Sequence, residues 1–126
     1  LSNVHLLGYQ PNPERWLLIT DILCLPSYRE GFGNVVIEAA AMGVPTVGTD
    51  IPGLKDAIIN NETGILVAVK DVAALTLALT KLLLDENLRA SMGLSACIRA
   101  REKFDALKLT KLLLKEYNSL CDEYIK

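Results

Sequence analysis

The sequence has few of the residues that mark metal sites, disulfide-rich folds or membrane spans. It contains one histidine and three cysteines, an odd number of thiols without the Cys-x-x-Cys spacing of zinc sites. No apolar run approaches the ~20 residues that a membrane-spanning helix needs, and no signal peptide is visible. We therefore expect a cytoplasmic protein with buried, reduced thiols and no zinc site, whose contact with any membrane would be peripheral.

The sequence also lacks an excess of charge of either sign. Its formal net charge is −2 at pH 7. The sequence therefore has no excess of positive charge to attract phosphate backbones, which argues against a dedicated nucleic-acid binder. Its 126 residues, 51% of them hydrophobic, are enough for one domain with a core. Because the chain begins at Leu1 rather than at a methionine, we expect a fragment of a longer protein.

What is present is a glycine-rich turn between two apolar runs that predict strands, 21–26 and 45–48. Gly31 and Gly33 flank Phe32, so the backbone can adopt turns that other residues resist and a ligand can approach it closely. A helix is predicted over 35–42, with Gly33 or Asn34 as its N-cap. The first free amides of this helix predict a binding site for phosphate.

Two carboxylates, Glu30 and Glu38, flank this predicted anion site. Glu38 is the only polar side chain from Val35 to Met42, so we expect a helix that is apolar all round and largely buried. Its carboxylate must then be paired or kept wet by a cleft. Carboxylates would repel a phosphate, so they are better suited to accept hydrogen bonds from hydroxyl groups on either side of it. A nucleotide sugar fits this arrangement.

The rest of the chain alternates between strand-like and helix-like patterns, which indicates an α/β fold with a Rossmann-like, three-layer parallel sheet and extra C-terminal helices. The further predicted strands are 4–7 and 65–69, and the further predicted helices are 14–19, 54–59, 71–83, 85–101 and 106–125. Ligands bind beyond the carboxyl ends of parallel strands, so Gly8, Tyr9 and Gln10 are placed to meet a nucleobase. A surface-packed aromatic is an equal alternative for Tyr9.

The last predicted helix carries an apolar stripe, formed by Leu109, Leu113, Tyr117, Leu120 and Tyr124. We expect most of the stripe to pack on this domain, and an exposed remainder would favour self-association. Arg99, Arg101 and Lys103 are interpreted as a solvated face, with contact to an anionic membrane as the weaker alternative.

Glu30 and Glu38, separated by seven residues and with Gly-Phe-Gly after the first, resemble the E-x7-E signature of the retaining glycosyltransferases of family 4. The resemblance extends along the chain through Leu6-Leu7-Gly8, Asp21–Ser27, Gly43-Val44-Pro45, Gly64–Val67, Arg89 and Met92-Gly93. These enzymes are group 1 glycosyltransferases with the two-domain GT-B fold. The resemblance implies that residues 1–126 are the C-terminal, donor-binding domain and that the N-terminal acceptor domain is absent.

The resemblance also implies an activity and residue roles. The activity is transfer of a sugar, with retention, from a uridine or less often guanosine diphosphate sugar to an acceptor hydroxyl, without metal or cofactor, in bacterial polysaccharide or glycolipid synthesis. Glu30 would be catalytic and bind donor-sugar hydroxyls, and Glu38 would bind the ribose. The amides around Phe32, Gly33, Asn34 and Val35 would hold the sugar and the diphosphate. The other donor-binding residues would be Gly8, Tyr9, Gln10, Ser27 and Gly31.

Two alternatives remain open. Glu30 and Glu38 could be the acid and nucleophile of a glycoside hydrolase, which needs two carboxylates about 5–10 Å apart. The glycine turn counts against this, because it suits an anionic group that hydrolase substrates lack. A non-catalytic module that binds a nucleotide sugar is harder to dismiss, since the acceptor half is missing and the fragment alone is expected to be inactive. Asp56 stands where the family usually has a glutamate, so no role is carried over to it.

Overall fold

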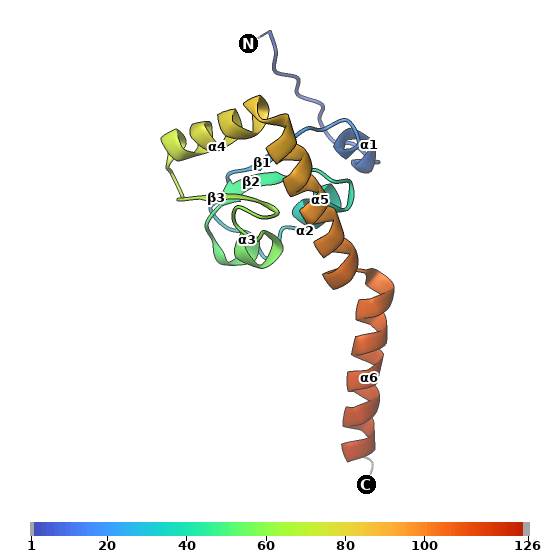
Figure 1. The fold of residues 1–126 in the computed structure, drawn as a ribbon. Helices are drawn as coiled ribbons and strands as arrows, with labels where there is room; N and C mark the ends of the chain where they lie inside the picture. Colours follow the sequence, from blue (N-terminus) through green and yellow to red (C-terminus); the bar gives the residue numbers. More distant parts are fainter. Residues whose placement is uncertain (1, 125–126) are drawn as a thin grey trace.

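The computed structural model describes residues 2–124 of the chain. Helices and strands alternate through the first half of the chain, and three longer helices follow (Figure 1). In order they are α1 (Glu14–Leu17), β1 (Leu23–Leu25), α2 (Asn34–Ala41), β2 (Thr46–Thr49), α3 (Pro52–Ala57), β3 (Gly64–Val67), α4 (Val72–Leu84), α5 (Glu86–Lys103) and α6 (Ala106–Tyr124). From residue 14 onward, the predicted order of helices and strands is therefore confirmed.

The sheet has three parallel strands in the order β1-β2-β3. Thr46 at the start of β2 pairs with Leu23 of β1 on one side and with Gly64 of β3 on the other. The amino ends of all three strands are therefore level with one another, and so are their carboxyl ends. Parallel neighbours need crossover connections, which α2 and α3 supply. All four residues of β2 are buried, as expected for a central parallel strand.

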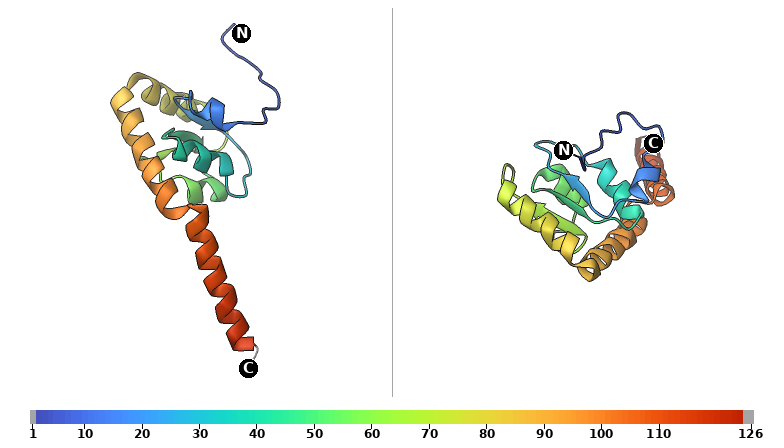
Figure 2. Two further views of the ribbon diagram at one scale, coloured as in Figure 1. Left: turned by 90° about the vertical axis from the view of Figure 1, so that its right-hand side faces the viewer. Right: turned by 90° about the horizontal axis from the view of Figure 1, so that it is seen from above.

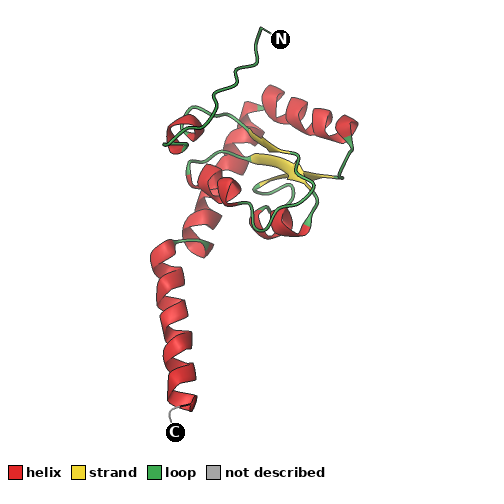
Figure 3. Cartoon of the chain, turned by 180° about the vertical axis from the view of Figure 1, so that it is seen from behind, coloured by secondary structure: helices red, strands yellow, loops and turns green. Residues whose placement is uncertain are grey.

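Helices cover both faces of the sheet, which gives three layers (Figure 3). On one face, α4 and α5 pack Leu82 and Met92 against Val47 of β2 and Ile65 of β3. On the other face, α2 and α3 pack against the opposite sides of the strands; this cluster contains Val36, Leu54, Ile58, Leu23 and Leu66. The alternation of Ile65 and Leu66 between the two faces follows from the two-residue period of a strand. The predicted Rossmann-like architecture is confirmed.

Two predicted helix starts are confirmed by their capping bonds. The Asp71 carboxylate accepts a hydrogen bond of 2.8 Å from the amide of Ala74, and the Asp85 carboxylate accepts one of 2.9 Å from the amide of Leu88. Each bond satisfies an amide that has no partner within its own helix. Asp71 and Asp85 are therefore the N-caps of α4 and α5.

The predicted strand over residues 4–7 is wrong. These residues form an extended, exposed segment that ends at Gly8 and pairs with no strand of the described sheet. A strand gains its stability from backbone hydrogen bonds to a neighbour, and an apolar pattern alone supplies none. The sheet edge formed by β1 is unpaired within residues 2–124.

The prediction that the last helix packs mostly on this domain is also wrong. α6 extends away from the sheet and its helices (Figure 2), and residues 106–123 are all exposed. The side chain of Tyr124 and the predicted helix end at Ile125 lie outside the described residues. The apolar stripe of α6 therefore meets no other element of the domain along 106–123.

The cysteines are less buried than predicted. All three are free thiols; Cys24 and Cys121 are exposed, and Cys97 is half-buried. Cys24 lies on β1 between Leu23 and Leu25, which pack on the α2 and α3 side, so its own side chain points to the opposite face and remains exposed there. Partial burial still raises the pKa of the Cys24 thiol, which keeps it protonated at neutral pH.

None of the helices within residues 2–124 combines the length and the apolar character that crossing a membrane requires.

Candidate functional site

The site is built where β1 ends and α2 begins. The hydroxyl of Ser27 donates a hydrogen bond of 3.0 Å to Oε1 of Glu30, which is half-buried. The hydroxyl of Thr49, at the end of β2, donates to the Ser27 carbonyl. Two neighbouring strand ends are thus joined through side chains, and this bonding orients the Glu30 carboxylate.

Gly33 is the N-cap of α2, one of the two residues predicted for that place. Its φ of 72° lies in the left-handed region, which glycine adopts without the steric cost that a side chain adds. No described side chain caps the helix, and Asn34 and Val35 are too early in it to have intrahelical acceptors. Their amides and the positive end of the helix dipole are therefore available to an anion.

α3 supports the turn from the inner side. A Cβ added to Gly53 would lie 2.3 Å from the Glu30 carbonyl oxygen and 2.7 Å from that of Gly31, so only glycine allows this approach. On the outer side, a Cβ added to Gly31 would meet nothing within 4 Å. The turn is consequently fixed against the protein on one side and open on the other.

Glu38 is exposed, so the prediction of a helix buried all round is wrong. α2 buries only one face, formed by Val36, Ala39 and Ala40. Glu38 follows Asn34 by four residues, which places both on the outward face of the helix near the free amides. Its carboxylate is solvated because this helix face is open, so the pairing or cleft that a buried carboxylate would need is not required.

Phe32 in the glycine turn contacts an aromatic residue that the sequence analysis missed. Its ring lies 5.4 Å from that of Phe104, in an edge-to-face arrangement at 66°. Arg99 stacks over the Phe104 ring at 5.3 Å and donates a 2.8 Å hydrogen bond to the Asp56 carbonyl. Arg99 is therefore half-buried, and its assignment to a solvated face is wrong. A signal was available, since Phe104 is the single aromatic residue at the break between two predicted helices.

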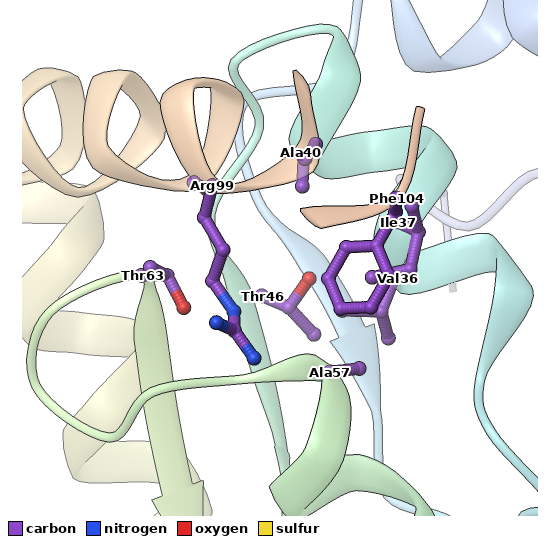
Figure 4. A pocket seen from close by; sticks show the side chains of 10 residues that line it. Val36, Ile37, Ala40, Thr46, Ala57, Thr63, Arg99 and Phe104 are labelled. Atoms are coloured by element: carbon purple, nitrogen blue, oxygen red, sulfur yellow. The ribbon is translucent and has the colours of Figure 1, made fainter. Parts of the chain in front are cut away.

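A small cavity beside α2 is lined by residues of α2, α3 and α5 together with Thr46 of β2, Thr63 and Phe104 (Figure 4). Its volume is about 10 Å³, and Nε of Arg99 is buried without a hydrogen-bond partner among the described residues. That space is close to what one water molecule occupies. The cavity is therefore far too small for a nucleotide sugar.

The structure places Gly8, Tyr9 and Gln10 in the extended segment before α1. Gln10 donates a 2.7 Å hydrogen bond to the Leu7 carbonyl and accepts one of 3.2 Å from the indole of Trp16. Tyr9 is 91% exposed. Within residues 2–124 the hydrogen bonds of this segment are local, and none reaches the glycine turn.

The chemistry offered by the site is that of amides and carboxylates. Glu30 and Glu38 can accept hydrogen bonds from hydroxyl groups, and the first amides of α2 can donate to phosphate oxygens. Among residues 2–124, no group of three or more histidines, cysteines or acidic residues is placed to hold a metal ion. The arrangement suits a ligand that combines an anionic centre with hydroxyl groups.

Sequence comparison identifies relatives of the chain. The family described as glycosyl transferases group 1 matches residues 1–97. The chain is 35% identical over 121 residues to the capsular polysaccharide biosynthesis glycosyltransferase CapM of Staphylococcus aureus, covering 96% of this chain and 32% of CapM. It is 35% identical over 115 residues to N-acetyl-alpha-D-glucosaminyl L-malate synthase of Bacillus anthracis, covering 86% of this chain and 30% of that enzyme.

Structural comparison agrees with the sequence match. The fold superposes on TarM of S. aureus, solved with fondaparinux, alpha-GlcNAc-glycerol and UDP, with a TM-score of 0.85 and 28% identity, covering 93% of this chain and 24% of TarM. The chain thus spans about a third or less of the length of these relatives. Its fold is that of part of a GT-B glycosyltransferase. The chain belongs to the glycosyl transferases group 1 family.

Proposed function

We propose that this chain is the donor-binding part of a retaining glycosyltransferase of family 4. It binds a uridine diphosphate sugar in preference to a guanosine diphosphate sugar and contributes to sugar transfer onto an acceptor hydroxyl in bacterial polysaccharide or glycolipid synthesis. The acceptor is held by the part of the enzyme that the relatives have and this chain lacks. The observation that carries the proposal is the uncapped start of α2 between Glu30 and Glu38.

In this proposal the amides of Asn34 and Val35 donate to the diphosphate, with the helix dipole adding to the attraction. Glu30, oriented by Ser27, accepts from hydroxyl groups of the donor sugar. Glu38, one helical turn beyond Asn34, accepts from the ribose. Transfer then depends on positioning the sugar and on stabilising the charge that develops on the leaving diphosphate, without a metal in the site.

The experiment is a titration of the chain with uridine diphosphate and with guanosine diphosphate, followed by amide chemical shifts. We expect saturable shifts over residues 31–38, larger or at lower concentration with uridine diphosphate. Glu38→Ala removes hydrogen bonds to a charged acceptor, worth about 1.5–3 kcal/mol, and should weaken binding about tenfold to a hundredfold. Glu116→Ala, on the exposed α6, is the matched control and should bind as the parent chain does.

Two outcomes would contradict the proposal. Shifts that saturate elsewhere, or that Glu38→Ala leaves unchanged, would mean that the start of α2 is not the nucleotide site. Hydrolysis of an oligosaccharide without any nucleotide would instead support a glycoside hydrolase. Joining the chain to the remainder of a group 1 enzyme and measuring transfer distinguishes a catalytic part from a module that only binds the donor.

A further inference from the structure

The junction between α5 and α6 consists of Phe104 and Asp105, and local bonds fix the direction in which α6 leaves it (Figure 1). The Asp105 carboxylate accepts a hydrogen bond of 2.9 Å from the amide of Lys108, so a new helix begins here. The ammonium of Lys108 donates one of 3.3 Å back to the Arg101 carbonyl near the end of α5. A change in the direction of α6 therefore acts first on the junction that contains Phe104.

Phe104 is the residue of this junction that contacts the candidate site. Its half-buried ring meets the ring of Phe32 edge to face at 5.4 Å. Within residues 2–124 this pair is the single contact between aromatic rings. Phe32 is itself 37% exposed, so it has few other partners to hold it. The position of the Phe32 side chain therefore depends on the ring of Phe104.

A second connection runs from the junction to the same turn through α3. Arg99 lies over the Phe104 ring at 5.3 Å and reaches toward α3 (Figure 4), where it donates its 2.8 Å hydrogen bond to the Asp56 carbonyl. Gly53, three residues earlier in the same helix, is the residue that approaches the backbone carbonyls of the turn. The junction thus contacts the glycine turn directly through one ring and indirectly through α3.

The glycine turn has little hydrogen bonding of its own. Within residues 2–124, no backbone amide of residues 30–33 donates a hydrogen bond to another backbone group, although the Gly33 carbonyl accepts one of 2.8 Å from Val36. The outer side of the turn is open at Gly31. The geometry of the amides that begin α2 therefore depends on packing at the inner side, to which the contact between Phe32 and Phe104 belongs.

We propose that Phe104 is a positioning residue of the donor site. By holding the ring of Phe32, it keeps the amides at the start of α2 in the geometry that binds the diphosphate. The inference rests on the proposed function, and it links the direction of α6 to the donor site through one ring. Without the contact, the turn samples other geometries and binding has to restore the productive one, which lowers the affinity.

The test is a double-mutant cycle on the full chain, with uridine diphosphate as the probe and amide chemical shifts over 31–38 as the readout. The variants are Phe104→Leu, Phe32→Leu and the two together, since leucine keeps an apolar side chain and removes the ring. Each single variant should weaken binding about twofold to tenfold, the range that an aromatic pair contributes. Both remove the same contact, so the double variant should bind no more weakly than the weaker single variant.

Leu82→Ala is the control for stability. Leu82 is fully buried on the α4 side of the sheet, on the face opposite α2 and α3. This variant should therefore unfold more easily than either leucine variant, yet bind the nucleotide as the parent chain does. Leu107→Ala, at an exposed position near the start of α6, should change neither property. If Phe104 had a structural role alone, its variant would resemble Leu82→Ala, with reduced stability and unchanged affinity.

The proposed function is decided by the parent chain, and the positioning role by the variants. A parent chain whose signals over 31–38 do not respond to uridine diphosphate overturns both. If the parent chain binds, the positioning role is overturned when Phe104→Leu binds equally well, or when the losses of the two single variants multiply in the double variant. A loss of similar size in both single variants and in the double variant supports it.

Discussion

α2 and α6 are both rich in apolar residues, yet their surroundings differ completely. α2 packs against α1, α3, α5 and the sheet, and its partly exposed outer face carries Glu38. α6 has a longer apolar stripe and extends into solvent with residues 106–123 exposed (Figures 1 and 2). An apolar pattern therefore shows what a helix is able to bury, but the partner has to be supplied by the rest of the molecule.

The contrast between the packed α2 and the exposed α6 also shows which elements support the glycine turn of the candidate site and which do not. The glycine turn is supported by α3 through Gly53 and by the α5 to α6 junction through Phe104. The body of α6 contributes no comparable contact. Substitutions in the two supports should therefore change the turn, whereas substitutions along α6 should not.

Of the two supports of the turn, the larger effect is expected at Gly53. Gly53→Ala places a Cβ 2.3 Å from the Glu30 carbonyl oxygen, where backbone rather than a flexible side chain has to move. Such overpacking costs about 1–3 kcal/mol and sometimes more, so the free energy of unfolding should fall by at least this amount. Urea unfolding measures it. Gly31→Ala is the matched control for stability, because its Cβ meets nothing within 4 Å.

Equal unfolding free energies for the two alanine variants would mean that α3 does not support the turn. The same samples allow a second check, because displacement of the Glu30 carbonyl should shift the amide signals of residues 31–33 in Gly53→Ala before any ligand is added.

A smaller effect is expected at Phe104. Phe104→Ala removes the edge-to-face contact with Phe32 and the ring beneath Arg99. These contacts together contribute about 1–2 kcal/mol. The variant should lose stability by that order and should shift the amide signals of residues 31–33 in the absence of nucleotide. Leu107→Ala, at an exposed position three residues later, should change neither quantity.

Unchanged signals over 31–33 in Phe104→Ala would mean that the ring stabilises the helix junction alone. A change in the position of α6 would then not alter the glycine turn through the contact between Phe104 and Phe32.

The parts of the structure that the sequence predicted are those decided by local chemistry. Asp71 and Asp85 cap helices because their side chains bond to amides three residues on. Gly33, one of the two residues predicted as the N-cap of α2, takes that place because glycine adopts the left-handed backbone without steric cost. The strands predicted over 21–26 and 65–69 lie within two residues of their observed bounds, because parallel strands covered by helices are nearly continuously apolar in sequence.

The parts that the sequence did not predict depend on partners distant in the chain. Residues 4–7 have a strand-like pattern but no neighbour to pair with in the described sheet. Glu38 is exposed because the helices around α2 leave one of its faces open. The approach of Gly53 to Glu30, and that of Phe104 to Phe32, leave no local pattern in the sequence at all.

The smallest change in the free energy of unfolding is expected for substitutions on α6. Measuring it tests whether α6, unlike α2, is unpacked in solution. Leu113 is 55% exposed, so Leu113→Ala should change the free energy of unfolding by no more than about 0.5 kcal/mol. Leu82→Ala, at a fully buried leucine of α4, should cost about 2–5 kcal/mol in the same assay. If Leu113→Ala lowers stability by an amount that grows with protein concentration, a second copy of the chain covers the stripe, because association stabilises the folded state by mass action. In that case α6, like α2, is a packed helix, and its partner is another molecule of the same chain.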